Sequence, residues 1–481
     1  MDSTSISEQR REQVSRERLE TSARRLFEQQ ECPGASVAVV DGAETVLTAG
    51  FGDRQINPQT PATAETLYGI GSSTKPITAT AVMTLVDDGS ISLTDAVSEY
   101  VPYFEDAPGD PILVKELLSH TSGMPSDDIA ANLLMGEVVG ADLDRSVDDW
   151  DAFQEYVEES ADRRLVGDDR CLYYNSGYVT LSRLIETVTG TTFSKYVEAN
   201  VFDPLGMNDS TFNVDILGDE SRDTMTPYFR QDGETQAASF PDSPLLQAPG
   251  GLQTSVTDLL EFLAAWNKRD LPFDTVLAEN MFEPIGTFRT LVDGSEINYG
   301  YGWMTRPFGD DILVGHGGGT GVSAGYLGFL RERGLGVAIG CNAQPDTAPE
   351  TIAMKLLATA TGVEPSAVVP SQAVKQKQQE LTGKYTAYSG LQNARVLWTG
   401  ENLRVEYSSP MGTETMRVIP TSLESDRYTF QKVTNSATQT KVEFFVEDDA
   451  VRLLIARNLF ERVGDLEGED RQSQPEDEKD E

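Results

Sequence analysis

The chain has 481 residues, 39% of them hydrophobic and 24% charged, which is typical of a globular protein long enough for two or three domains. Aspartate and glutamate number 78 against 38 lysines and arginines, giving a formal net charge of −40. Such a field repels phosphate backbones and anionic lipids, so neither a nucleic acid nor a membrane surface is an expected partner. The acidic residues are spread along the chain, and we favour adaptation to high salt over an ordinary solvated surface as their explanation.

The N-terminal residues and the cysteines indicate in which compartment the protein works and whether it binds a metal or cofactor. Residues 1–13 are polar and charged and carry no apolar export signal, and no window approaches the apolar length that spans a bilayer. The three cysteines, Cys32, Cys171 and Cys341, show neither a zinc nor a disulfide spacing. We therefore expect a cytoplasmic protein with reduced thiols, and we expect neither a metal ion nor a cofactor.

The N-terminal part of the chain predicts a charged helix, a hairpin and a second helix. Strands are expected at 35–40 and 44–51, joined by an Asp-Gly-Ala turn. The stretch 68–75, Tyr-Gly-Ile-Gly-Ser-Ser-Thr-Lys, then leads into a helix with apolar residues at helical spacing. Proline is tolerated only in the first turn of a helix, so Pro76 places the helix start close to Ser72.

The middle of the chain predicts further helices and strands. The acidic residues 127–170 contain helical patches and are expected to form a mostly helical subdomain. Helices are expected at 114–118, 178–188, 193–201, 256–266 and 351–361, and strands at 299–303, 311–314, 324–330 and 334–341.

The composition of the sequence changes after residue 363. Residues 364–379 contain two prolines and four glutamines, which predicts a linker. Eight short strand candidates then recur and predict a small antiparallel barrel over residues 380–464. The acidic residues 465–481 are expected to be disordered. The expected organisation is a large domain over residues 1–363, a linker, a barrel domain and a tail.

The candidate catalytic pair lies at the start of the second helix. Ser72 is followed three residues later by Lys75, and this spacing places both side chains on one face of a helix. The N-terminal end of a helix favours negative charge, and a serine hydroxyl becomes nucleophilic when a neighbouring base takes its proton. Ser-x-x-Lys also occurs by chance on exposed helix faces, so the other motifs decide its meaning.

Two further motifs follow in chain order. Tyr173-x-Asn175 precedes a helix, and His316-Gly317-Gly318 follows a strand. Three flanking stretches accompany them: 117–123 (Leu-Leu-Ser-His-Thr-Ser-Gly), 204–207 (Pro-Leu-Gly-Met) and 249–252 (Pro-Gly-Gly-Leu). With these motifs the chain resembles, over about residues 20–362, the serine β-lactamase and penicillin-binding-protein superfamily. It is most similar to the class C-like β-lactamase-related serine hydrolases, which include esterases, D-aminopeptidases and related S12-type peptidases.

The resemblance implies a fold and a set of roles. The expected fold class is α+β, an antiparallel sheet flanked by helices with a helical subdomain, followed by a small antiparallel β-barrel that resembles the lipocalin-like domain of some family members. The resemblance implies that Ser72 is the nucleophile that forms the acyl-enzyme and that Lys75 assists its deprotonation. It implies that Tyr173 is the general base and later the general acid, and that Asn175 binds the substrate. The backbone N–H groups of Ser72 and Gly319 would form the oxyanion hole, with Gly318 allowing close approach of the backbone.

His316 departs from the pattern of the lactamases, which usually carry a lysine there to bind the β-lactam carboxylate. A histidine resembles the esterase and peptidase members and brings a group that can join proton transfer directly. Lys75, Tyr173 and His316 therefore all stay open as the main base. His120, the other histidine of the chain, is expected to hold its loop.

The expected function is a serine hydrolase that cleaves small amides or esters, either short or D-amino-acid peptides or carboxylesters, through an acyl-enzyme on Ser72. A β-lactamase or penicillin-binding DD-peptidase is the alternative enzyme. A non-catalytic ligand-binding module of the same fold is the alternative outside enzymes, and the intact set of motif residues argues against it. For the barrel three roles stay open: capping the cleft, assembling a homo-oligomer, or serving as a passive appendage.

Overall fold

The computed structural model describes residues 15–126, 129, 133, 147, 149–167, 170–219, 221–231, 233–409, 412–424, 426–433, 441–447 and 450–466. Almost all of the expected tail and much of the expected helical subdomain lie outside these described residues. The chain divides into two compact units, one comprising 1–289 with 297–364 and the other 290–296 with 365–481. None of the helices in the described part is long and apolar enough to cross a membrane.

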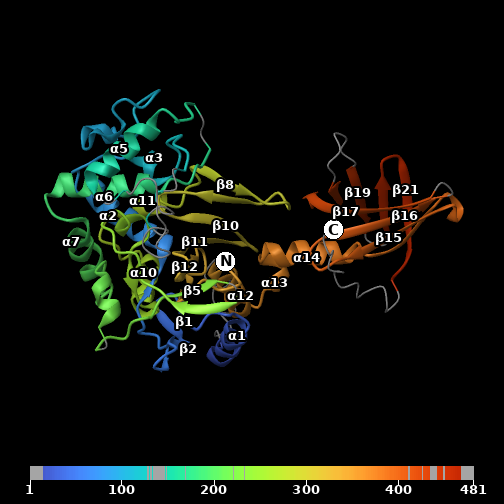
Figure 1. Cartoon of the computed structure of the whole chain (residues 1–481), viewed down its shortest axis with the longest axis horizontal. Coiled ribbons are helices and arrows are strands. Elements are labelled where there is room, and N and C mark those ends of the chain that lie inside the picture. Colours follow the sequence, from blue (N-terminus) through green and yellow to red (C-terminus); the bar gives the residue numbers. More distant parts are fainter. Residues whose placement is uncertain are drawn as a thin grey trace, which may run out of the picture. The chain divides into compact units, whose positions relative to one another are not determined.

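Within the described residues of the first unit, nine strands form one sheet in the order β3-β2-β1-β13-β12-β11-β10-β9-β8 (Figure 1). Its central strands pair antiparallel, and almost every residue of β1, β12 and β13 is buried. The strands are β1 (Gly34–Asp41), β2 (Glu44–Gln55), β3 (Thr60–Pro61), β8 (Gly286–Thr290), β9 (Glu296–Tyr299), β10 (Met304–Phe308), β11 (Asp311–Gly319), β12 (Ala324–Leu330) and β13 (Leu335–Cys341).

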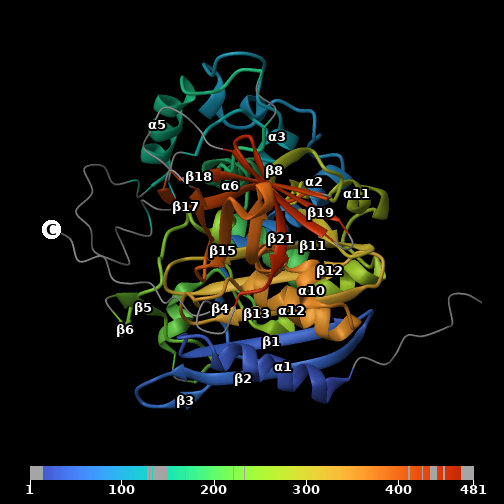
Figure 2. The ribbon, with the colours of Figure 1, turned by 90° about the vertical axis from the view of Figure 1, so that its right-hand side faces the viewer.

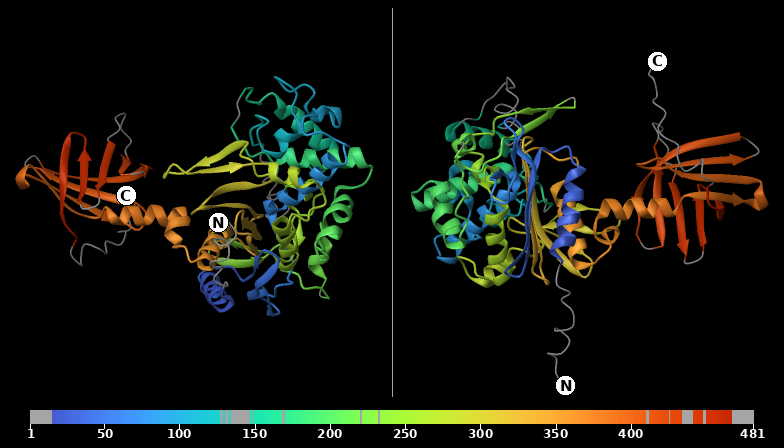
Figure 3. Two further views of the ribbon diagram at one scale, coloured as in Figure 1. Left: turned by 180° about the vertical axis from the view of Figure 1, so that it is seen from behind. Right: turned by 90° about the horizontal axis from the view of Figure 1, so that it is seen from below.

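Helices cover both faces of this sheet, as expected for the α+β class. The helix α1 (Arg16–Glu28) lies over β2 and packs against α12 (Pro349–Thr361), whereas α10 (Val256–Lys268) packs on β1 and β13 from the opposite face (Figures 2 and 3). The unit also contains further helices and two short two-stranded sheets. These are α2 (Lys75–Asp87), α3 (Val114–Leu118), α5 (Trp150–Ala161), α6 (Asn175–Thr189), α7 (Phe193–Val197), α8 (Asp203–Leu205), α9 (Gln247–Gly250), α11 (Thr275–Asn280), β4 (Tyr68–Gly69) with β7 (Gln253–Thr254), and β5 (Tyr228–Gln231) with β6 (Glu234–Ala237).

The helix α2 is the most deeply buried of these helices. Every residue from Lys75 to Leu85 is buried. Three of these residues are threonines, and their hydroxyls form hydrogen bonds with neighbouring groups. A helix that is buried on all sides is fixed by contacts around its whole circumference. The position of the turn that precedes α2, where Ser72 lies, is therefore set by the core of the unit.

The following local expectations differ from the structure. The motif His316-Gly317-Gly318, expected to follow a strand over residues 311–314, lies inside β11. The expected strand 299–303 is a turn between β9 and β10, because Gly302 has a φ of 79° and the N–H of Gly300 donates to the carbonyl of Trp303. Where one helix is expected over residues 193–201, the structure has the short helix α7, and a π-helical turn over Glu198–Phe202 follows it. The expected linker 364–379 is largely helical.

The second unit begins with two helices, α13 (Pro365–Val368) and α14 (Pro370–Glu380), and continues as a closed antiparallel barrel. Apolar side chains such as Val396, Phe430 and Phe444 fill its interior. All eight strand candidates correspond to barrel strands among the described residues. These are β14 (Gly383–Ala387), β15 (Gln392–Trp398), β16 (Leu403–Ser409), β17 (Gly412–Ser422), β18 (Arg427–Lys432), β19 (Lys441–Glu447), β20 (Ala450–Ile455) and β21 (Asn458–Gly464).

Candidate active site

Ser72 lies in a 3₁₀ turn, Gly71–Thr74, that runs directly into α2. Its neighbours in the turn are buried, whereas Ser72 itself is partly exposed. The turn is held against β11, because the hydroxyl of Ser73 donates to the carbonyl of His316 at 3.0 Å. The sequence therefore presents one accessible hydroxyl on an otherwise buried and hydrogen-bonded turn.

The amine of Lys75 contacts three oxygens. Its Nζ lies 3.1 Å from Ser72 Oγ, 2.9 Å from Asn175 Oδ1 and 2.8 Å from the carbonyl oxygen of Pro249. Lys75 is fully buried, and this burial lowers the pKa of its amine well below the usual value. In the part of the chain that the structure describes, no carboxylate forms an ion pair with this amine to oppose the shift.

The three partners of Lys75 constrain its protons. A neutral amine has two N–H bonds and one lone pair. The amide oxygen of Asn175 and the carbonyl of Pro249 only accept hydrogen bonds, so they take the two N–H groups. The lone pair is then left for the third neighbour, the hydroxyl of Ser72. This is the arrangement in which an amine can take the proton of a serine.

Tyr173 and Asn175 come from the loop that leads into α6, and Asn175 is the first residue of that helix. The hydroxyl of Tyr173 forms a hydrogen bond with Ser72, and the Lys75 Nζ lies 4.8 Å from the centre of the Tyr173 ring. Burial raises the pKa of Tyr173, and the hydrogen bond with Ser72 opposes only part of the rise. The phenol is therefore protonated at neutral pH.

His316 is buried on β11, and both of its ring nitrogens have partners. Nδ1 lies 2.7 Å from the carbonyl oxygen of Gly317, which only accepts, so Nδ1 carries the proton. Nε2 then accepts from the hydroxyl of Tyr299 at 2.9 Å. Burial, followed by the nearby Lys75, lowers the pKa of His316 to about 3, so the ring is neutral at neutral pH.

The glycines of β11 lie against the nucleophile turn. A Cβ atom at Gly318 would lie 2.4 Å from the backbone nitrogen of Ser72, and one at Gly71 would lie 2.5 Å from the nitrogen of Gly319. Side chains at these positions are therefore excluded. Gly71 also has a φ of 55°, which favours glycine. The result is a close approach of two backbone segments next to Ser72.

The structure thus brings Ser72, Lys75, Tyr173 and Asn175 together and lays β11, with His316, Gly318 and Gly319, beside them. Sequence reasoning missed two partners, the carbonyl of Pro249 and the hydroxyl of Tyr299. A backbone carbonyl leaves no side-chain signal, although Pro249 belongs to the Pro-Gly-Gly-Leu stretch that accompanies the motifs. Among the described residues, no group of three or more His, Cys, Asp or Glu side chains is placed to hold a metal ion.

Comparison with known proteins assigns both units. Residues 16–360 match the β-lactamase family model, which covers more than half of the chain. The chain belongs to the β-lactamase family. It is thereby placed in the superfamily of serine hydrolases that includes β-lactamases and penicillin-binding proteins. Residues 365–461 match a second family model, the Pab87 octamerisation domain.

Individual relatives of this β-lactamase family member cover one or both units. The octameric penicillin-binding protein homologue from Pyrococcus abyssi is 30% identical with a TM-score of 0.74, over 93% of this chain and 99% of that one. Penicillin-binding protein 4* of Bacillus subtilis (strain 168) is 25% identical over 92% of this chain and 96% of its own length. A D-stereospecific amidohydrolase from Streptomyces sp. shares the fold, with 22% identity, a TM-score of 0.57, and coverage of 72% of this chain and 98% of that one.

Proposed function

We propose that the protein is a serine hydrolase that cleaves small amides or esters through an acyl-enzyme on Ser72. The observation that carries the proposal is the hydrogen bonding of Lys75, whose two acceptor-only partners leave the amine lone pair to the hydroxyl of Ser72. This arrangement favours Lys75 as the base that activates the nucleophile, out of the three candidates.

In the first half of the reaction Lys75 takes the proton of Ser72 while Oγ attacks the carbonyl carbon of the substrate. In this mechanism the backbone N–H groups of Ser72 and Gly319 stabilise the negative oxygen that develops. The protonated phenol of Tyr173 then donates its proton to the leaving nitrogen or oxygen, and the ammonium of Lys75 returns a proton to the phenolate. Water hydrolyses the acyl-enzyme by the reverse order of proton transfers.

His316 supports this proposal as a neutral group that fixes β11 beside the nucleophile. With Nδ1 donating to Gly317 and Nε2 accepting from Tyr299, neither nitrogen is left to take the proton of Ser72. A neutral ring also supplies no fixed positive charge for a substrate carboxylate. The neutral state of position 316 therefore disfavours β-lactams, whose recognition uses a carboxylate, and favours carboxylesters and amides without a free carboxylate.

The substrate class is tested by assaying one preparation in molar KCl, since the charge of −40 favours high salt. The panel contains p-nitrophenyl esters, D-aminoacyl and L-aminoacyl anilides, and a chromogenic β-lactam. We expect turnover of esters or anilides that disappears in Ser72→Ala. Fast β-lactam turnover with inert esters and anilides would instead establish the lactamase alternative. Absence of turnover and of Ser72 acylation in folded protein would support the binding module.

We further propose that the barrel assembles the protein into a homo-oligomer. The support is the match of residues 365–461 to an octamerisation domain and the octameric relative that spans nearly the whole chain. Light scattering on the full chain after gel filtration measures the particle mass. We expect a multiple of the 52.6 kDa chain mass, and a monomer at micromolar concentration would contradict the proposal.

A further inference from the structure

His120 has a backbone conformation that is unusual for its residue type. It follows α3 in the Ser-His-Thr-Ser-Gly loop, its φ is 58°, and only 1% of its surface is exposed. A residue with a Cβ atom in this left-handed region is strained, so the surrounding contacts must hold it there.

Two hydrogen bonds and one ring contact join His120 to the segment that carries Tyr173. The carbonyl of His120 accepts the N–H of Leu172 at 2.8 Å, and its Nδ1 accepts the N–H of Tyr174 at 3.1 Å. Between these two bonds the imidazole packs on the ring of Tyr173, with ring centres 4.3 Å apart. One residue therefore binds the backbone on both sides of Tyr173 and also supports its side chain.

The protonation state of His120 follows from these bonds. Nδ1 accepts a backbone N–H and so has no proton, which leaves the proton of the neutral ring on Nε2. Nε2 has no hydrogen-bond partner among the residues that the structure describes, and the ring lies near Tyr178 and Tyr299. Burial first, and then Lys75, lower the pKa of His120 well below its usual value. The ring is thus neutral and unsuited to exchange protons during turnover.

We propose that His120 is a positioning residue for Tyr173. It holds the phenol where it can bond to Ser72 and protonate the leaving group, and it does so through Tyr173 without itself touching the substrate. The inference rests on the proposed function, because it requires that Tyr173 is the general acid. A displaced phenol slows only the step in which a proton must reach the leaving group.

This role predicts a change in relative rates between substrates that a purely structural role would not cause. A leaving group such as p-nitrophenolate departs without protonation, whereas an alkoxide or an amine needs an acid. Loss of the positioning contact should therefore spare p-nitrophenyl esters and slow ethyl esters and amides of the same acyl group. Simple destabilisation would lower all rates in proportion to the folded fraction.

Two substitutions separate the contacts of His120. His120→Gly keeps the left-handed backbone and the bond from Leu172 but removes both the acceptor and the ring. His120→Asn tolerates the same backbone and offers Oδ1 as an acceptor for the N–H of Tyr174. Tyr173→Phe serves as the reference for a missing acid. Arg269→Gly, at another left-handed residue with a φ of 57°, controls for the exchange itself.

The experiment measures kcat/KM for p-nitrophenyl, phenyl and ethyl esters and an amide of one acyl group, with the folded fraction checked by thermal melting. We expect the ratio of ethyl-ester to p-nitrophenyl-ester rates to fall by about 10²-fold in Tyr173→Phe and by at least about 10-fold in His120→Gly. His120→Asn should recover much of this loss, and Arg269→Gly should leave the ratio unchanged.

The labelling of Ser72 by a fluorophosphonate, whose fluoride leaves without an acid, is measured on the same proteins. If Ser72 of the wild type does not label, the proposed function has failed. If it labels but His120→Gly lowers all rates equally or none, the positioning role is overturned. An unchanged ratio in Tyr173→Phe with normal labelling would also overturn it, because Tyr173 would not be the acid.

Discussion

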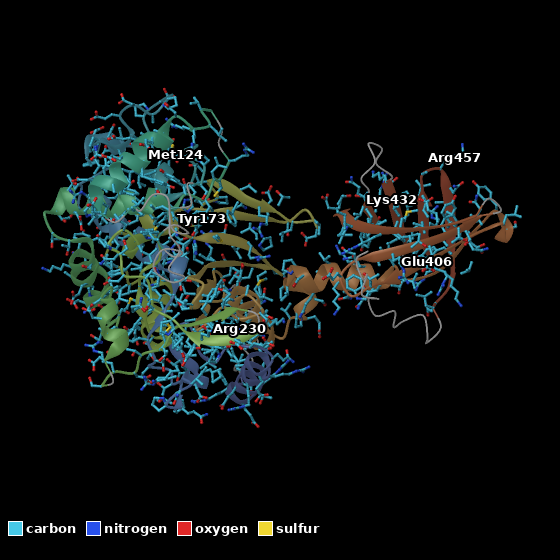
Figure 4. All side chains as sticks on the ribbon, viewed as in Figure 1. Met124, Tyr173, Arg230, Glu406, Lys432 and Arg457 are labelled. Atoms are coloured by element: carbon cyan, nitrogen blue, oxygen red, sulfur yellow. The ribbon has the colours of Figure 1, made fainter. Side chains whose placement is uncertain are left out.

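The active-site cluster and the C-terminal barrel handle polar side chains in opposite ways. Around Ser72 the polar groups of Lys75, His120, His316 and Tyr299 are buried and neutral, and they are joined by specific hydrogen bonds. In the barrel the interior is apolar, and charged residues such as Glu406 and Lys432 form ion pairs on the outside (Figure 4). The residues of the active-site cluster come from a 3₁₀ turn, from α2, from loops and from β11, whereas the barrel consists of antiparallel strands.

The difference shows where the chain maintains chemistry at the expense of stability. A buried polar group loses its hydration, and each one must be offset by hydrogen bonds to the protein. A cross-strand ion pair at the surface keeps its water and contributes little. Substitutions near Ser72 should therefore change the reaction strongly, whereas substitutions of surface charges on the barrel should change neither reaction nor fold.

Replacing Lys75 should have the largest effect. Lys75→Met removes the base and should lower kcat by at least about 10³-fold. Lys75→Arg is the sharper variant, because a guanidinium donates hydrogen bonds but is never neutral. If the neutral amine is the base, Lys75→Arg is as inactive as Lys75→Met in a steady-state ester assay. Substantial activity in a folded Lys75→Arg protein would show that only a positive charge is needed.

The pH dependence distinguishes the same cluster from a histidine-based site. Activity needs neutral Lys75, whose pKa is lowered, so kcat/KM should fall only as the pH drops below that value. The pKa of Tyr173 is raised, so the phenol stays protonated and the rate should stay flat on the alkaline side up to about pH 10. A profile of kcat/KM against pH measures both limits. A change of kcat/KM near pH 6.5 that disappears in His316→Asn would contradict the conclusion that His316 stays neutral.

The bond between Tyr299 and His316 should have an intermediate effect. Tyr299→Phe removes the hydroxyl and leaves the buried Nε2 of His316 without its donor, which should lower the free energy of unfolding by about 1–3 kcal/mol. We expect kcat to fall by about 10-fold or less, because the ring positions β11 and does not exchange the proton. Denaturant titration and ester kinetics measure the two effects. A loss as large as that of Lys75→Met would assign His316 a direct part in proton transfer.

The smallest effect is expected on the barrel. Arg417 on β17 forms an ion pair with Glu401, and both side chains are exposed, so Arg417→Gln should change the free energy of unfolding by no more than about 0.5–1 kcal/mol. The rate of ester hydrolysis should not change. Chemical denaturation of the variant beside wild type tests this, and a change of several kcal/mol would remove the contrast between the two regions.

Sequence reasoning predicted the parts of this molecule that leave a local pattern. The barrel strands alternate apolar and polar residues, and all eight strand candidates correspond to strands of the barrel. The Ser72, Tyr173 and His316 motifs were recognised because each stands in the expected order beside a helix or strand. The structure brings these motifs together, and their catalytic roles stay proposals.

The features that were not predicted depend on contacts between distant segments. Pro249 acts through a backbone carbonyl, and Tyr299 meets His316 only through the arrangement of β9, β10 and β11 in the sheet. The alternating Tyr-Gly-Tyr-Gly-Trp run suggested a strand, but the positive φ of Gly302 makes it a turn. The left-handed φ of His120 likewise has no local sequence signal, because its cost is offset by the Tyr173 loop.

The most direct test of the account is the covalent labelling of Ser72 by a fluorophosphonate in molar KCl, read by intact mass and peptide mapping. We expect one adduct on the peptide that contains Ser72, no adduct in Ser72→Ala, and labelling at least about 10²-fold slower in folded Lys75→Arg. An adduct elsewhere, no adduct on folded wild type, or equally fast labelling of Lys75→Arg would contradict the claim that neutral Lys75 activates Ser72.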